Sequence, residues 1–111
     1  MDTEQLSQVV MRVLESYSLL SSPSNPVQPK LLFDTTHHRY QLLKYGWEGS
    51  KRFFYVVVYI DVKDNLIWIQ DDNTEVGIAS LLLKEGVPKD SIVLAFHPPQ
   101  LRQYTEFNPA V

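Results

Sequence analysis

The sequence predicts a small α+β domain. We expect an N-terminal helix, a four-stranded antiparallel meander, then a helix and a short C-terminal helix packed on the sheet. Residues 3–20 carry apolar side chains at helical spacing, and four apolar runs joined by short turns lie between residues 31 and 69. Short connections predict antiparallel pairing, because parallel strands need a long crossover. Residues 66–86 then change from a strand pattern to a helix pattern.

The first helix is predicted over residues 3–20. Its apolar residues recur every three or four positions: Leu6, Val9, Val10, Val13, Leu14, Tyr17 and Leu20. Asp2 or Thr3 is suited to cap its start. The opposite face has few basic residues, which favours a helix lying on a sheet over one lying on a membrane surface.

A proline-rich linker and the strands follow the first helix. Residues 21–29 hold three prolines and three serines, which exclude a helix or a central strand, so we expect a loop. The expected strands are Leu31–Phe33, Tyr40–Trp47, Phe53–Ile60 and Leu66–Ile69. Alternation places Leu43, Tyr45 and Trp47 on one face of the second strand. The third is apolar throughout, which predicts a central strand covered on both faces.

The last expected strand leads into the second helix through an acidic turn. Asp72 and Glu75 have the spacing of a capping box, and Thr74 lies between them. We therefore expect these three residues to set the helix start. The helix should end near Gly86. Beyond it, residues 92–96 form either a short strand or an extended segment, and Pro98-Pro99 opens a short helix through Tyr104.

Composition restricts the class of protein. The 111 residues suit a single domain covering 1–111, with a net charge of −3 and no cysteine. The lack of cysteine excludes disulfides and thiolate metal sites and fits a reducing compartment. No apolar run approaches the roughly 20 residues of a membrane span. The start, with Asp2 and Glu4, does not resemble a secretory signal, so we expect a cytoplasmic protein.

The acidic residues do not predict one metal site. Asp61 and Asp64 precede a strand that Asp71 and Asp72 follow, so they should lie at opposite ends of it. A smaller cation site of Asp71, Asp72 and Glu75 stays open, but we favour helix capping for these residues.

The histidines predict no metal site, and the known catalytic motifs are missing from the sequence. His37 and His38 are adjacent, which suits chelation poorly, and His97 is distant in sequence. The sequence contains no nucleophile elbow, phosphate-binding loop, dinucleotide fingerprint or H-E-x-x-H motif. We expect no enzyme activity, no cofactor and no metal.

Basic and aromatic residues gather around the second and third expected strands. Candidate nucleic-acid contacts are Arg39, Lys44, Lys51 and Arg52. Candidate residues of a protein interface are Tyr45, Trp47, Trp68 and Tyr104. We favour a solvated hairpin with core aromatics over nucleic-acid binding, and an interface with a partner protein stays open.

Short segments and single residues, spread from residue 40 almost to the end of the chain, carry a family resemblance. They are Tyr40-Gln41-Leu42-Leu43, Gly46-Trp47, Ile67-Trp68-Ile69-Gln70, Asp72, Thr74-Glu75, Gly77-Ile78-Ala79, Leu82, Gly86-Val87-Pro88-Lys89, Ile92-Val93-Leu94, Phe96, Pro99, Arg102 and Tyr104-Thr105. This pattern resembles the XisI family, the fdxN-element excision controlling factors of cyanobacteria. The N-terminal helix fits the start of that family.

The resemblance implies a small α+β domain with an accessory role in excising a DNA element, beside a separate recombinase and a second factor, XisH. It implies no catalytic residues. Three hypotheses follow: a non-enzymatic controlling factor that binds an XisH-like protein, an architectural factor that binds DNA directly, and an inhibitor of an XisH-like nuclease. The acidic balance favours the first or third over the second. A homo-oligomer also stays open.

Overall fold

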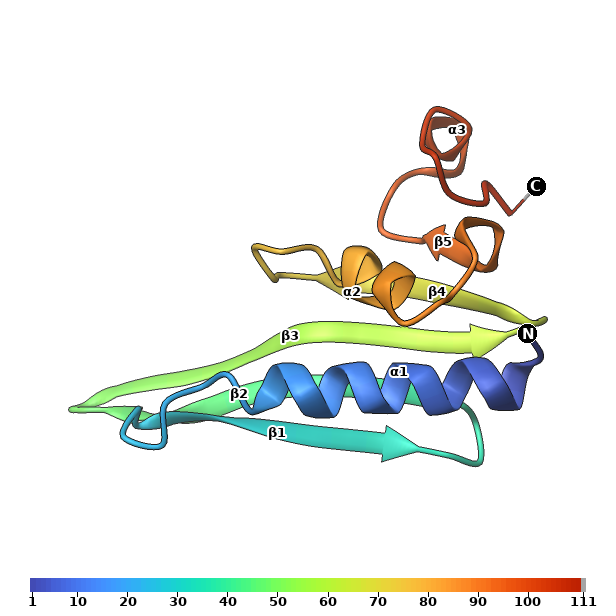
Figure 1. Ribbon diagram of the computed structural model, residues 1–111. Helices are drawn as coiled ribbons and strands as arrows, with labels where there is room; N and C mark the ends of the chain where they lie inside the picture. The colour runs from blue at the N-terminus through green and yellow to red at the C-terminus, as the bar shows by residue number, and fades with distance from the viewer. Residues whose placement is uncertain (111) are drawn as a thin grey trace.

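The computed structural model describes residues 1–110 as a sheet with its two longer helices on one face (Figure 1). The elements are α1 (Thr3–Ser18), β1 (Val27–Asp34), β2 (Arg39–Glu48), β3 (Lys51–Lys63), β4 (Leu66–Asp72), α2 (Ile78–Lys84), the 3-10 turn η1 (Lys89–Ser91), β5 (Ile92–Leu94) and α3 (Pro99–Arg102). The strand order is β1-β2-β3-β4-β5, so the α+β class predicted from the sequence is confirmed.

The sheet has five strands where the sequence predicted four. Ile92–Leu94 pairs parallel with Ile67–Ile69 of β4, while the first four strands pair antiparallel. The connection between β4 and β5 passes through α2, which supplies the crossover that a parallel pair requires. Ile92 and Val93 are fully buried, so this short strand belongs to the packed interior.

Strand β1 begins earlier than the sequence predicted. Val27–Asp34 is a continuous strand, although the linker was expected to run as far as Pro29. Pro29 lies opposite Lys44, and β1 is an edge strand. An edge strand tolerates proline because the missing N–H can fall on the side that has no neighbouring strand.

Helix α1 forms the second layer of the domain. Asp2 caps it, with its Oδ1 accepting from the Gln5 N–H at 2.8 Å and its own N–H donating to Gln5 Oε1 at 2.9 Å. The helix was predicted to reach residue 20, but it ends at Ser18.

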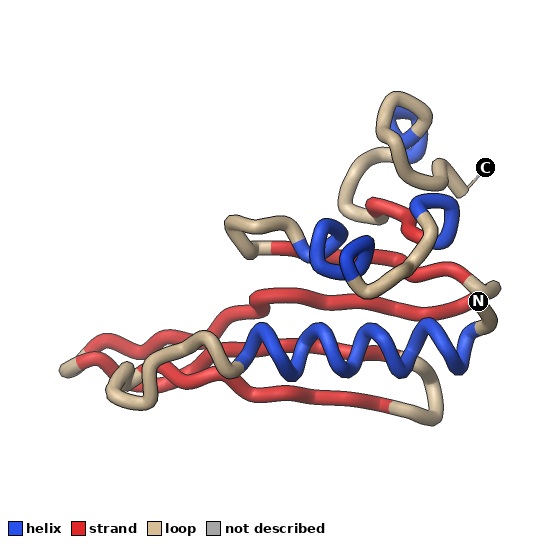
Figure 2. Tube along the Cα trace, in the orientation of Figure 1, coloured by secondary structure: helices blue, strands red, loops and turns tan. Residues whose placement is uncertain are grey.

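Helices α1 and α2 bury their apolar side chains against one face of the sheet, whereas α3 has no buried residue. Helix α2 lies beside α1 on this face, as Figures 1 and 2 show. The fully buried side chains include Leu6, Val10, Leu14, Tyr40, Leu42, Val58, Ile60, Ile67, Ile69, Ile78 and Leu82. No helix within residues 1–110 has the length and the apolar character needed to cross a membrane.

Strand β3 is central, but the prediction that both of its faces are covered is wrong. Phe54 is 63% exposed and Tyr55 is 43% exposed. The β2–β3 hairpin extends well beyond the C-terminal end of α1 and forms an arm, here residues 43–56 (Figure 1). A β-bulge lies at the root of the arm, where Leu42 faces Val58 but Leu43 faces Val56.

The second helix starts later than the sequence predicted. It begins at Ile78 after Gly77, and the predicted capping box between Asp72 and Glu75 does not form. Instead the Asp72 carboxylate accepts from the Ile78 N–H at 2.8 Å, from the Thr74 N–H at 2.9 Å and from the Thr74 hydroxyl at 2.6 Å. Asp72 therefore holds a whole turn in place ahead of the helix.

Gly46 is where the linker crosses the arm. A Cβ at this position would lie 2.1 Å from the Pro26 carbonyl oxygen. We predict that Gly46→Ala lowers the free energy of unfolding by about 1–3 kcal/mol, because the linker backbone must move away. Thermal and urea denaturation measure the change.

Gly49→Asn is the control for this substitution. Gly49 lies at the hairpin tip with a φ of 63°, and a Cβ there would have nothing within 4 Å. Asn tolerates this backbone conformation better than most residues. The denaturation midpoint of this variant should stay close to that of the wild type. A Gly46→Ala protein as stable as Gly49→Asn would show that the crossing is not constrained.

The hydrogen bonds of Asp72 predict different stabilities for two further variants, Asp72→Ala and Glu75→Ala. Asp72→Ala removes an acceptor of three hydrogen bonds and should cost about 1–3 kcal/mol of unfolding free energy. Glu75→Ala should change it by less than about 0.5 kcal/mol, since Glu75 is exposed and lies before the helix start. Equal losses in urea denaturation would instead support the capping box.

Candidate protein interfaces

The sheet face turned away from α1 and α2 is called the open face below. Strand alternation and the cross-strand partners assign its residues. They include Lys30, Leu32, Arg39, Leu43, Tyr45, Trp47, Arg52, Phe54, Val56, Tyr59, Asp61 and Trp68. Within residues 1–110, no helix packs on this side of β1–β3 (Figure 2). Leu32, Trp47 and Phe54 are each more than half exposed.

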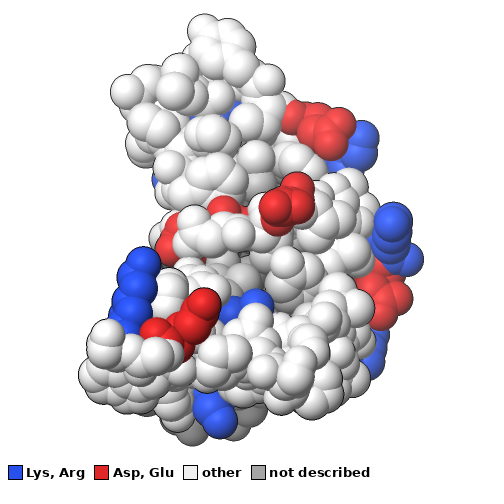
Figure 3. Space-filling view, turned by 90° about the vertical axis from the view of Figure 1, so that its left-hand side faces the viewer, with Lys and Arg blue, Asp and Glu red and all other residues white. Residues whose placement is uncertain are grey.

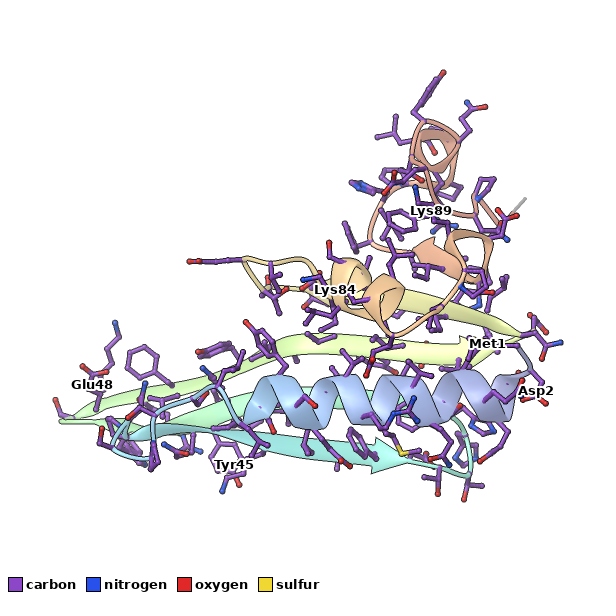
Figure 4. The ribbon with its side chains drawn as sticks, viewed as in Figure 1. Met1, Asp2, Tyr45, Glu48, Lys84 and Lys89 are labelled. Carbon is purple, nitrogen blue, oxygen red and sulfur yellow. The ribbon has the colours of Figure 1, made fainter. Side chains whose placement is uncertain are left out.

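Aromatic rings and cations form a stack on the arm part of the open face. Tyr45 and Phe54 stack with their centroids 5.7 Å apart and their planes 15° apart. The Arg52 guanidinium lies 5.4 Å from the centroids of both Tyr45 and Trp47. Such contacts contribute about 0.5–1 kcal/mol each at exposed sites. Figure 4 shows Tyr45 and Glu48 on opposite sides of the hairpin.

At the other end of the open face lies a carboxylate, that of Asp61, with only one of its two oxygens hydrogen-bonded. Asp61 Oδ2 accepts from the Gln70 amide at 3.2 Å, but the buried Oδ1 has no hydrogen-bond donor among the described residues. Burial raises the pKa of the neighbouring Tyr59 hydroxyl, and the charge of Asp61 raises it further, while Arg39 acts against the rise. The charge on Asp61 therefore acts on the Tyr59 hydroxyl at this end of the face.

A groove lies on the helix side of the molecule, where α1 ends beside α2. Its volume is about 270 Å³, and its lining residues are Val13, Ser16, Tyr17, Leu20, Leu81, Lys84 and Glu85. Leu20, in this lining, is 77% exposed, and its neighbour Leu19 is 82% exposed. Two adjacent exposed leucines beside an apolar groove with a charged rim resemble a protein-binding surface.

Comparison with known proteins decides the family. The family model described as XisI protein matches residues 1–109. The chain belongs to the XisI family. A XisI-like protein from Anabaena variabilis ATCC 29413 has a crystal structure with a TM-score of 0.89 and 32% identity, covering 96% of this chain and 98% of that one.

A second solved structure supports this assignment for the XisI-family chain. It is described as the fdxN element excision controlling factor XisI from Anabaena variabilis ATCC 29413. The TM-score is 0.80 and the identity 30%, with 96% of this chain and 97% of that chain covered. No curated protein matches the chain.

The four interface residues predicted from the sequence do not form one patch. Tyr45, Trp47 and Trp68 lie on the open face, the first two on the arm and Trp68 at the opposite end. The Trp68 indole donates to the Lys63 carbonyl at 3.3 Å. Tyr104 is 79% exposed just beyond α3, away from the other three.

The four cations proposed as nucleic-acid contacts are divided between the two faces. Arg39 and Arg52 belong to the open face, whereas Lys44 and Lys51 point to the opposite side of the hairpin. Figure 3 looks toward the hairpin end and shows acidic and basic side chains close together with much uncharged surface. The hairpin therefore presents no single basic surface in this view.

The histidines and acids form no candidate metal site within residues 1–110. His37 Nδ1 lies 2.8 Å from Asp34 Oδ2, and the hydrogen bonds from His37 lower the pKa of that carboxyl. His38 Nδ1 lies 3.1 Å from the Ser7 hydroxyl and 3.0 Å from the Tyr40 hydroxyl. Both histidines thus have local partners in and around the β1–β2 turn.

Sequence reasoning missed three residues that matter to these surfaces. Phe54 was assigned to a strand covered on both faces, and Leu20 to the buried stripe of a longer helix. Lys30, 5.5 Å from the Tyr45 ring, was placed after a loop. The early end of α1 reveals Leu20 and the early start of β1 reveals Lys30, whereas Phe54 is exposed because no helix covers the open face.

Proposed function

We propose that this chain is a non-enzymatic controlling factor that acts by binding an XisH-like protein in the excision of a DNA element. Membership of the XisI family supports this role, as does the likeness to a structure described as an excision controlling factor. The proposal assigns the chemistry of excision to other proteins.

The observation that carries the proposal is the groove at the end of α1. Its apolar lining, its charged rim and the exposed Leu19 and Leu20 fit an apolar segment of a partner. Exposed leucines of this kind are costly in a protein that works alone, because they invite non-specific association. We assign this groove to the XisH-like protein.

Direct DNA binding is the weaker alternative. It would use Arg39, Lys44, Lys51 and Arg52 together, but these cations are divided between the two faces of the hairpin. With a net charge of −3, the chain also lacks the basic surplus usual in proteins that bind phosphates.

The binding proposal predicts the effect of one substitution. Leu20→Glu places a charge in the groove and should weaken copurification with the XisH-like protein at least tenfold. Leu101→Glu, at an exposed leucine on α3, is the matched control and should bind as the wild type does. Affinity measured by calorimetry, with wild-type melting curves for both variants, tests this. Equal binding by all three proteins would remove the groove from the interface.

Coexpression separates a controlling factor from a nuclease inhibitor. If the XisH-like protein is toxic alone and wild-type chain restores growth while Leu20→Glu does not, the contact is inhibitory. Equal growth with and without this chain would leave the controlling role. Failure of the two proteins to associate at micromolar concentrations would contradict both.

A further inference from the structure

On the open face Arg52 lies on the arm, and Asp61 lies at the other end with Arg39 opposite it on β2. Arg52, on the arm, contacts aromatic rings. Asp61, at the other end, has a buried oxygen without a donor. The ion pairs within residues 1–110 are His37–Asp34 and Lys89–Glu106, so neither Arg52 nor Asp61 takes part in one.

The bulge at Val57 puts these two ions on the same face. They are nine residues apart on β3, and in a regular strand an odd separation places side chains on opposite faces. The extra residue between Val56 and Val58 reverses this relation. Arg52 and Asp61 are therefore on one face but about 30 Å apart, too far to pair within one chain.

The open-face residues of β3 are spaced symmetrically about the bulge. Counting outward from the point between Val56 and Val57, Phe54 corresponds to Tyr59 and Arg52 corresponds to Asp61. Each pair joins two side chains that complement one another, ring with ring and cation with anion. Such spacing is what a two-fold axis lying across β3 requires of a self-complementary surface.

We propose that the open face is covered by a second copy of this chain, with the two β3 strands antiparallel across the interface. Arg52 of each copy then pairs with Asp61 of the other, and Phe54 packs on Tyr59 of the other. The same operation brings Trp47 to the level of Arg39 in the second copy, because Trp47 lies opposite Arg52 and Arg39 lies opposite Asp61.

The exposed area on this face is of the size that such a dimer needs. Aromatic side chains bury about 150–250 Å² each, so the exposed parts of Trp47 and Phe54, with Leu32, supply several hundred Å². Half-buried Leu43, Tyr45, Val56 and Tyr59 extend the patch toward the roughly 800 Å² per partner of a specific interface.

The rings also prepare Arg52 for pairing. Stacked against Tyr45 and Trp47, its guanidinium loses little further freedom when a carboxylate approaches. The proposal does not depend on the XisH-like partner, since the groove at the end of α1 lies on the other side of the sheet and stays accessible in this dimer. Its test therefore needs this chain alone.

Two charge reversals and their mixture test the proposal by sedimentation velocity. The wild-type chain should sediment as a dimer at tens of micromolar. Arg52→Asp and Asp61→Arg should each weaken self-association at least tenfold, because each homodimer would contain two like-charged contacts. An equimolar mixture of the two variants should dimerise again, since both contacts then join an Arg to an Asp.

Lys51→Asp is the matched control. Lys51 neighbours Arg52 but belongs to the opposite side of the hairpin, so its reversal should leave the dimer intact. Far-ultraviolet circular dichroism and melting curves establish that each variant is folded. A wild type that stays monomeric well above tens of micromolar, single variants that dimerise as tightly as the wild type, or a mixture that stays monomeric would each overturn the proposal.

Discussion

The difference in length between α1 and the sheet that it covers governs this fold. A helix of 16 residues is about 24 Å long, whereas a strand of 13 residues, the length of β3, is about 43 Å long. The helix protects one end of the β2–β3 hairpin and leaves the other end as an arm. The linker must then cross from the end of α1 to the edge strand, and it does so over Gly46, where a Cβ would not fit. The exposed leucines, the arm and this crossing all follow from one mismatch of length.

Most of the fold could be predicted from the sequence because its elements are locally determined. The stripe from Leu6 to Leu14 and the alternation in β2 each depend on side chains a few residues apart. The errors arose where the answer depends on distant neighbours. Pro29 is acceptable only because β1 lies at an edge, and β5 exists only because β4 offers it a free edge. The start of α2 depends on Asp72 reaching six residues ahead to Ile78, which no capping pattern describes.

The candidate surfaces were harder to predict for a related reason. An apolar run such as Phe53–Ile60 looks the same whether one face or both are covered, because side-chain type does not report what lies above a strand. Trp47 and Tyr45 could be assigned to one face by alternation, and the register agrees. Their grouping with Arg52 and Phe54 depends on the register of the hairpin, in which Trp47 faces Arg52 and Tyr45 faces Phe54. The groove likewise depends on where α1 stops.

The bulge at Val57 also determines how the arm continues from the body of the sheet. Val57 is an extra residue in β3 with no counterpart in β2, where Leu42 and Leu43 are consecutive. Deleting it would leave a regular strand in which Val56 and Val58 keep their partners, so the side chains of the arm would stay on their present faces. The deletion would remove the local bend and the extra twist that a bulge gives to its strand. This one residue therefore sets the direction in which the arm leaves the sheet, while strand alternation sets which side chains the arm presents.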